Sequence, residues 1–161
     1  MSVTVRVGRQ DDDAALADLD RRAWSPAVGF PSVRPTGTGF FAPGSPPEAH
    51  VVAEVDGRVA GYARLLHMLP LVEAAHVLTV AGLAVAPDLQ GRGVGHALLA
   101  GAEEQARRSG ARKLAIRVLA TNPAARRLYE RYGFTVEGVL VGEFLIEGRP
   151  VDDVVLGKSL A

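Results

Sequence analysis

Cysteine is absent from the sequence, which excludes disulfide bonds, a thiolate zinc site and a cysteine nucleophile. Charge of one sign is not in excess either, because 18 basic residues balance 18 acidic ones. This balance argues against a phosphate-backbone partner, so we expect no nucleic acid to bind. No apolar run reaches the length of a membrane span, and residues 1–13 lack the apolar core of a secretory signal. We therefore expect a cytoplasmic protein with no membrane partner.

The length of 161 residues fits one domain, which we place at 1–161. Hydrophobic residues make up 48% of the chain and charged residues 22%, so a single core can form without disulfides. The sequence has no internal repeat and no low-complexity tail.

Hydrophobic periodicity predicts strands interspersed with helices. The strands are expected at 3–7, 50–55, 58–67, 76–85, 113–119, 135–146 and 151–158, and the helices at 14–24, 93–109 and 122–132. Asp56-Gly57 predicts a tight hairpin turn, and residues 147–150 form a second turn. This order of elements predicts a mixed α/β sheet with helices on its faces.

Residues 25–47 are dense in Pro and Gly, with Phe30, Phe40 and Phe41 among them. The composition leaves two readings open, a flexible loop and a partly ordered lid. Long loops in compact domains are often binding elements, so these aromatic side chains are candidates for substrate contacts.

Glycines alternate where the strand that ends at Val85 gives way to a helix, at Gly91, Gly93 and Gly95. Glycine allows unusual backbone angles and lets a ligand approach the main chain closely. The first amides of the following helix have no intrahelical acceptor, and the positive end of the helix dipole lies there. This arrangement predicts an anion site suited to phosphates, to which Arg92 can add charge.

Two other phosphate-binding motifs fail on spacing. A nucleotide P-loop needs a Lys-Ser/Thr pair after its second glycine, and the sequence has none there. The dinucleotide pattern G-x-G-x-x-G meets His96 when it starts at Gly91 and Leu98 when it starts at Gly93. A glycine-rich turn without a ligand is the remaining alternative.

Two motifs carry a resemblance to the GNAT superfamily of N-acetyltransferases. The first resembles the coenzyme A pyrophosphate loop of that family, and its matching residues are Val85, Pro87, Gln90, Gly93, Gly95 and Leu98. The second, NPAARRLYERYGF at 122–134, resembles the segment N-x-x-A-x-x-L-Y-E-x-x-G-F. The resemblance covers about residues 50 to 160 and implies a mostly antiparallel twisted sheet of about seven strands, with splayed central strands and about four helices.

The resemblance implies acetyl-CoA as co-substrate, with no metal. The residues expected to bind it are Leu83, Ala84, Val85, Gln90, Gly91, Arg92, Gly93, Val94, Gly95, His96, Asn122 and Tyr129. Main-chain amides of the strand before the loop would polarise the thioester carbonyl. Gly82 is a candidate for the bulge that re-aims this strand.

Tyr129 matches the family tyrosine that faces the coenzyme sulfur, so the resemblance implies a general acid for the leaving thiolate. A packed aromatic on an amphipathic helix is the structural alternative, and Tyr132 could compete for the role. Asn122 matches a coenzyme-contacting residue and also fits a plain helix cap.

The general base is harder to assign. Positions where family members carry a glutamate correspond here to Thr79 and Arg117, neither of which is a base. His76 is the first remaining candidate, followed by Glu73 and His67.

The function predicted from the sequence is acetyl transfer from acetyl-CoA to a small-molecule or peptide amine by direct attack in a ternary complex. An amino-acid or peptide α-amine is the favoured acceptor. A non-catalytic acyl-CoA-binding or sensing domain is the alternative from another class. Homodimers are common in the resembled family, and dimerisation stays open.

Overall fold

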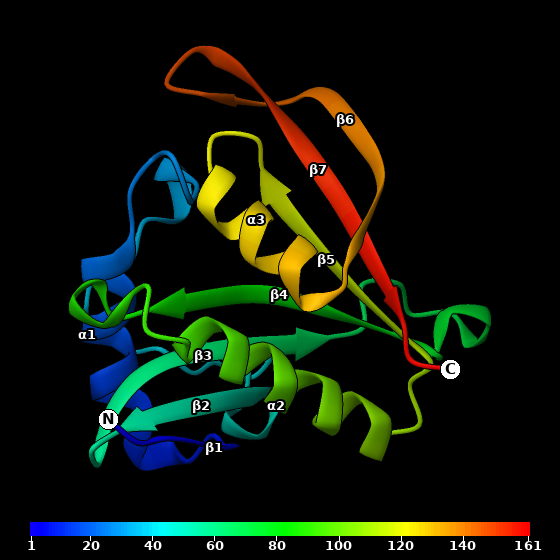
Figure 1. The fold of residues 1–161 in the computed structure, drawn as a ribbon. Coiled ribbons are helices and arrows are strands. Elements are labelled where there is room, and N and C mark those ends of the chain that lie inside the picture. The colour runs from blue at the N-terminus through cyan, green and yellow to red at the C-terminus, as the bar shows by residue number, and fades with distance from the viewer.

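The computed structural model describes all of residues 1–161 (Figure 1). Its strands are β1 (Val3–Val7), β2 (His50–Val55), β3 (Arg58–Leu66), β4 (Val77–Val85), β5 (Lys113–Leu119), β6 (Thr135–Ile146) and β7 (Arg149–Ser159). Its α-helices are α1 (Asp13–Ala23), α2 (Val94–Arg108) and α3 (Pro123–Tyr132). The predicted strands and helices are therefore confirmed, with three α-helices where the resemblance implies about four. Between α1 and β2 the chain forms the short 3₁₀ turns Pro31–Val33 and Pro47–Ala49 and an isolated β-bridge between Ala42 and Ser45. No helix is both long and apolar enough to cross a membrane.

One sheet of seven strands holds the molecule together, in the order β1-β2-β3-β4-β5-β7-β6. Every neighbouring pair is antiparallel except β4 and β5, which are parallel. This arrangement confirms the mixed, mostly antiparallel sheet predicted from the sequence.

The two parallel strands separate along their length, as Figure 1 shows. Their pairing covers only Val77–Val80 of β4, and β4 then continues to Val85 without β5. In the pairing of β4 with β3, Gly82 lies opposite Arg64 and Val80 opposite Leu65, so Ala81 is the extra residue of a bulge. The sequence had pointed to Gly82, one residue later. The bulge twists β4 away from β5 where the pairing ends.

Helices α1 and α2 cover opposite faces of the sheet. A Cβ placed on Gly61 of β3 would meet the side chain of Leu98 in α2 at 3.0 Å. The next residue, Tyr62, reaches Asp20 in α1 on the other face. Successive strand residues point to opposite faces, so one helix lies on each. Both helices bury leucines in one core of 28 residues.

Both hairpins use two-residue turns in the left-handed region. Asp56 and Gly57 have φ values of 50° and 80°, and Glu147 and Gly148 have 52° and 77°. Such turns match the right-handed twist of the flanking strands. The second turn is shorter than the predicted 147–150, because β7 already begins at Arg149. Pro150 is tolerated in β7 because β5 pairs with β7 only from Asp153 onward.

Candidate active site

A cavity of about 710 Å³ opens where β4 and β5 diverge. Most of the residues predicted to bind the coenzyme line it, namely Leu83, Ala84, Val85, Gln90, Gly91, Gly93, Gly95, His96, Asn122 and Tyr129. These residues come from β4, the following loop, α2 and α3. The fold therefore brings both sequence motifs to one cavity.

Arg92 and Val94 were also predicted to bind the coenzyme, but they do not line the cavity. Arg92 is exposed on the loop, and the Val94 side chain is 1% exposed within the core. Val94 begins α2 and turns inward because the same helix face carries the buried Leu98. Only its main-chain amide remains available at the start of the helix.

Backbone angles explain the first two glycines of the loop. Gly91 and Gly93 have φ values of 75° and 86°, which side-chain-bearing residues rarely adopt. A Cβ placed on either would meet no atom within 4 Å, so the main chain is open to the cavity. Gln90 fixes the loop from the other side, since its Nε2 donates to the Val85 carbonyl at 3.2 Å.

The start of α2 has unpaired amides. Gly93 is the N-cap residue, and no side chain caps the helix. The first turn of a 15-residue helix thus presents free N–H groups and the positive end of the helix dipole to the cavity. This end of the cavity is suited to an anion.

Gly95 serves packing between two helices. A Cβ at this position would lie 2.7 Å from Cδ2 of Leu128 in α3. Glycine therefore allows α2 and α3 to approach closely, which places Tyr129 beside the glycine loop. Of the alternating glycines, two set the loop's backbone and the third sets this helix spacing.

The edge of β4 forms another side of the cavity. Leu83–Val85 pair with β3, and no strand pairs with them on the side that faces β5. Main-chain N–H and C=O groups on that side are free to bind an extended ligand. This matches the role that the resemblance implies for these residues.

Tyr129 lines the cavity from α3 and is 5% exposed. Burial raises the pKa of its phenol to about 12. The group therefore keeps its proton throughout the neutral range and can donate it. Tyr132 does not line the cavity, and its hydroxyl donates to Glu103 at 3.3 Å. The geometry thus separates the two tyrosines.

Asn122 caps α3 and also lines the cavity. Its Oδ1 accepts a hydrogen bond from the Ala125 amide at 3.3 Å, which caps α3, and the residue also lines the cavity. The cap fixes the start of the helix that carries Tyr129.

The residues predicted as candidates for the general base lie outside this cavity. His76 is exposed just before β4, and its carbonyl accepts from the amides of Arg112 and Lys113. It lies five residues before the bulge at Ala81, about 16 Å along an extended strand. His67 and Glu73 are also exposed, and none of the three lines a described cavity. The direction of β4 places its carboxyl end, not its start, at the site.

Thr79 and Arg117, which stand where family members carry a glutamate, make contacts within the sheet. Thr79 is buried within β4 and pairs with Ala115 of β5. Arg117 forms ion pairs with Asp153 and Glu143. Neither lines the cavity.

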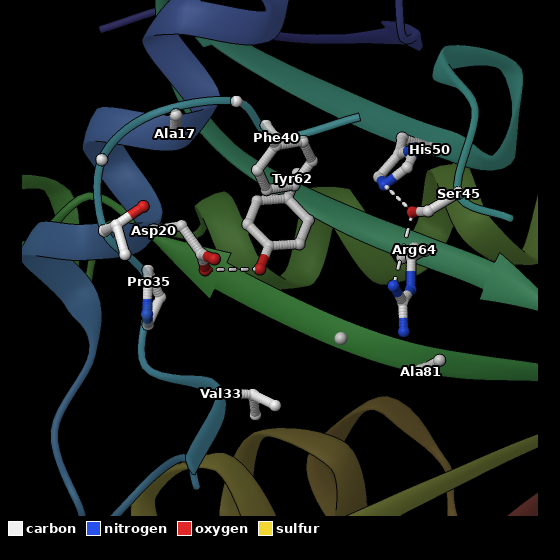
Figure 2. A pocket seen from close by; sticks show the side chains of 14 residues that line it. Ala17, Asp20, Val33, Pro35, Phe40, Ser45, His50, Tyr62, Arg64 and Ala81 are labelled. Atoms are coloured by element: carbon white, nitrogen blue, oxygen red, sulfur yellow. Dashed lines mark hydrogen bonds between the residues drawn. The ribbon is translucent and has the colours of Figure 1, made fainter. Parts of the chain in front are cut away.

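Sequence reasoning missed a second, smaller cavity of about 240 Å³, shown in Figure 2. Asp20, Tyr62, Ala81 and Gly82 line both cavities, so the two adjoin at the bulge of β4. Its other polar side chains include Ser45, His50 and Arg64. Two sequence signals could have indicated it. Asp20 lies four residues after Leu16 on the apolar side of α1, and Tyr62 and Arg64 share one face of β3.

The Pro/Gly segment 25–47 covers both cavities. Val33 and Pro35 line the two of them, and Phe30 lines the larger one. Phe40 packs against the core, and its amide donates to Asp13 Oδ1 at 2.9 Å. The prediction of a partly ordered lid describes this segment better than a free loop, because hydrogen bonds and aromatic packing hold it.

Comparison with known proteins identifies the family of this chain. The model of the acetyltransferase (GNAT) family matches residues 14–134. A phosphinothricin N-acetyltransferase of Alcaligenes faecalis is 31% identical over 167 residues, covering 98% of this chain and 82% of that protein. Other relatives match over shorter stretches. The chain covers 41% of an uncharacterized N-acetyltransferase of Methanocaldococcus jannaschii, at 33% identity over 92 residues and 56% of this chain.

Solved structures share the fold. A GNAT superfamily phosphinothricin acetyltransferase from Sinorhizobium meliloti, in complex with acetyl-CoA, has a TM-score of 0.83 at 20% identity. That match covers 100% of this chain and 90% of the other. A ribosomal-protein-alanine N-acetyltransferase from Brucella melitensis has a TM-score of 0.64 at 32% identity, over 69% of this chain and 68% of that one. The chain belongs to the GNAT family of acetyltransferases.

Proposed function

We propose that the protein transfers the acetyl group of acetyl-CoA to a primary amine by direct attack in a ternary complex. One observation carries the proposal. A helix start suited to an anion, an unpaired strand edge and a protonated tyrosine surround the larger cavity. Family membership and the names of the N-acetyltransferase relatives support the same activity.

The residues present fit acetyl-CoA. Its pyrophosphate suits the free amides of α2 and the open main chain at Gly91 and Gly93. Its pantetheine arm suits the unpaired edge of Leu83–Val85, where main-chain amides can polarise a carbonyl. When bound, the co-substrate supplies an activated acetyl group as a thioester.

Tyr129 is the proposed general acid. Its phenol is protonated at neutral pH, because its ordinary pKa near 10 already lies above that range and burial raises it to about 12. It can donate a hydrogen bond to a departing thiolate and pass on its proton as negative charge develops on the sulfur. With no cysteine in the chain, no thiol of the protein can carry the acetyl group between the two substrates.

Thiol release from acetyl-CoA in the presence of an amine panel tests this function. We expect release that depends on both acetyl-CoA and an amine, together with a mass gain of one acetyl group on that amine. Coenzyme binding is measured separately by calorimetry, because a binding domain would bind acetyl-CoA without releasing its thiol. Tight binding without turnover on any amine would favour the non-catalytic acyl-CoA-binding alternative.

A further inference from the structure

We propose that the smaller cavity binds the acceptor, and that it selects a small amine carrying a carboxylate or similar oxyanion. The amine end would lie at Asp20 and the anionic end at Arg64. This inference rests on the proposed acetyl transfer and names the acceptor class for it. A volume of about 240 Å³ lies below the usual range of drug-sized ligand pockets, so the acceptor is a small molecule.

Asp20 is the only acidic residue that lines either cavity, and it lines both. Its Oδ1 accepts a 2.6 Å hydrogen bond from the Tyr62 hydroxyl, which fixes the carboxylate at the junction (Figure 2). Helix α1 carries it there, four residues after the buried Leu16. A positioned carboxylate beside the coenzyme cavity is what an incoming amine requires.

Arg64 has donors without partners. Its Nε is buried and makes no hydrogen bond, and its Nη1 makes only a 3.3 Å contact with Ser45 Oγ. No carboxylate of the protein lies within ion-pair distance of it. A partly buried guanidinium without hydrogen-bond acceptors costs free energy. A planar oxyanion could accept hydrogen bonds from two of its N–H groups at once. His50 adds little positive charge here, because burial lowers its pKa.

Strand β3 sets the order of these groups. Tyr62 and Arg64 are two residues apart and so point to the same face. Figure 2 shows Asp20 and Arg64 on either side of Tyr62. Tyr62 and Arg64 lie opposite Ala84 and Gly82 of β4, next to the bulge where the cavities adjoin. An acceptor with its anion at Arg64 therefore directs its amine toward Asp20 and the larger cavity.

The proton balance of the transfer follows from these positions. Asp20 receives the proton that the amine nitrogen loses as its bond to the acetyl carbon forms. Tyr129 supplies the proton that the sulfur gains as the carbon–sulfur bond breaks. Exchange with solvent then returns both residues to their starting states.

The test compares α-amino acids with their carboxamides as acceptors, using alanine, methionine and glutamate. The measured quantity is the ratio of kcat/KM for acid over amide, because amine reactivity cancels when this ratio is compared between variants. We expect Arg64→Gln to lower the ratio about tenfold or more, and Arg64→Lys to lower it less. Arg58→Gln is the matched control on the same strand, since the Arg58 side chain is 72% exposed. It should leave the ratio unchanged.

A second pair of variants tests the amine end. Asp20→Asn should lower kcat about 100-fold on acids and amides alike, within the usual range for proton-transfer groups, while coenzyme affinity stays the same. Asp18→Asn, an exposed position on the same helix, should retain activity. An unchanged acid-to-amide ratio in Arg64→Gln, or full activity in Asp20→Asn, would overturn the proposal while acetyl transfer still stands.

A third outcome concerns the proposed function itself. If no amine supports thiol release, acetyl transfer fails and the pocket is tested by binding alone. Calorimetric titration of the acids and amides into the protein with coenzyme A then decides. Tighter binding of acids that is lost in Arg64→Gln would uphold the pocket, and equal binding of acids and amides would overturn it.

Discussion

The Tyr62 hydroxyl donates a 2.6 Å hydrogen bond to Oδ1 of Asp20, 42 residues earlier in the chain. This bond joins β3 to α1 at the junction of the two cavities, and Tyr62 is 8% exposed. Burial raises the pKa of Tyr62 well above its ordinary value, so it stays a donor. Tyr62→Phe removes a hydrogen bond to a carboxylate, and we expect a loss of about 1.5–3 kcal/mol in the free energy of unfolding. Urea unfolding measures it.

Tyr132→Phe is the control for that loss. In the wild type the Tyr132 hydroxyl makes a longer hydrogen bond, of 3.3 Å, to Glu103. The Glu103 carboxylate also accepts a hydrogen bond from Lys158. We expect a smaller loss, of about 0.5 kcal/mol. Equal losses in the two variants would contradict a special role for the Tyr62–Asp20 bond.

Tyr129→Phe tests the general acid directly. The ring keeps its packing, and only the proton donor is lost. We expect kcat to fall about 100-fold or more, while the dissociation constant for coenzyme A changes less than about threefold. Steady-state kinetics and calorimetry check the two parts. Because the pKa of Tyr129 is about 12, the wild-type rate should show no decline between pH 8 and 10 from loss of this proton. A rate equal to wild type in Tyr129→Phe would remove Tyr129 from the mechanism.

Gly93 and Gly110 form a matched pair for testing the loop. Both have φ of 86°, a Cβ on either would meet nothing within 4 Å, and they flank opposite ends of α2. Alanine at either position adopts a left-handed conformation, so each variant should lose about 1–2 kcal/mol of stability. Only Gly93→Ala should also weaken coenzyme A binding, because only Gly93 lines the cavity. Calorimetry measures the coenzyme A affinity of both variants, and thermal unfolding measures their stability. Equal coenzyme A affinity in Gly93→Ala and Gly110→Ala would contradict a role of the glycine loop in binding the coenzyme.

Much of the fold was predictable because periodicity and turn residues report local structure. The strand at 113–119 and the turn Asp56-Gly57 were located correctly from such signals. The cavity residues of the glycine loop were also foreseen, since a motif fixes their spacing. The base candidate His76 lies away from the cavity, because a residue's distance from the site depends on strand direction. His76 precedes β4, whereas the site lies at the other end of that strand.

Asp20 and Arg64 escaped prediction for a related reason. They lie 44 positions apart in the sequence and share a cavity only because α1 packs over β3. Neither belongs to a motif of fixed spacing. Local pattern cannot reveal such a pair, because its proximity is a property of the tertiary packing.

His50 should make the protein sensitive to mild acid. It is 1% exposed, and burial lowers its pKa from the ordinary value of 6.5. Below pH 6.5 the unfolded chain binds a proton that the folded protein does not, so stability is full above this pH and declines as pH falls toward the lowered pKa. The slope for one such group is at most about 1.4 kcal/mol per pH unit. Urea unfolding at pH 7.5, 6.5 and 5.5 should give a smaller acid loss in His50→Gln than in wild type. His67→Gln, at an exposed position, is the control and should keep the wild-type slope.

The acceptor's own pKa gives a further test. Neutralising a lysine side chain at pH 7 costs about 4.6 kcal/mol from a pKa near 10.4, whereas an α-amine near 7.8 costs about 1.1 kcal/mol. Neither cavity is lined by a lysine or a glutamate, and Asp20 is the one carboxylate there. The site therefore has few groups that could offset the larger cost, and we expect α-amines to be acetylated faster. Rates on Nα-acetyl-lysyl-glycine and Nε-acetyl-lysyl-glycine at pH 7 compare the two amines on one skeleton. The peptide bond keeps the α-amine pKa near 7.8, and the glycine supplies a free carboxylate for Arg64. A clear preference for the free ε-amine would contradict the expectation. A preference for the α-amine that narrows as pH rises toward 10 would identify amine deprotonation as its cause.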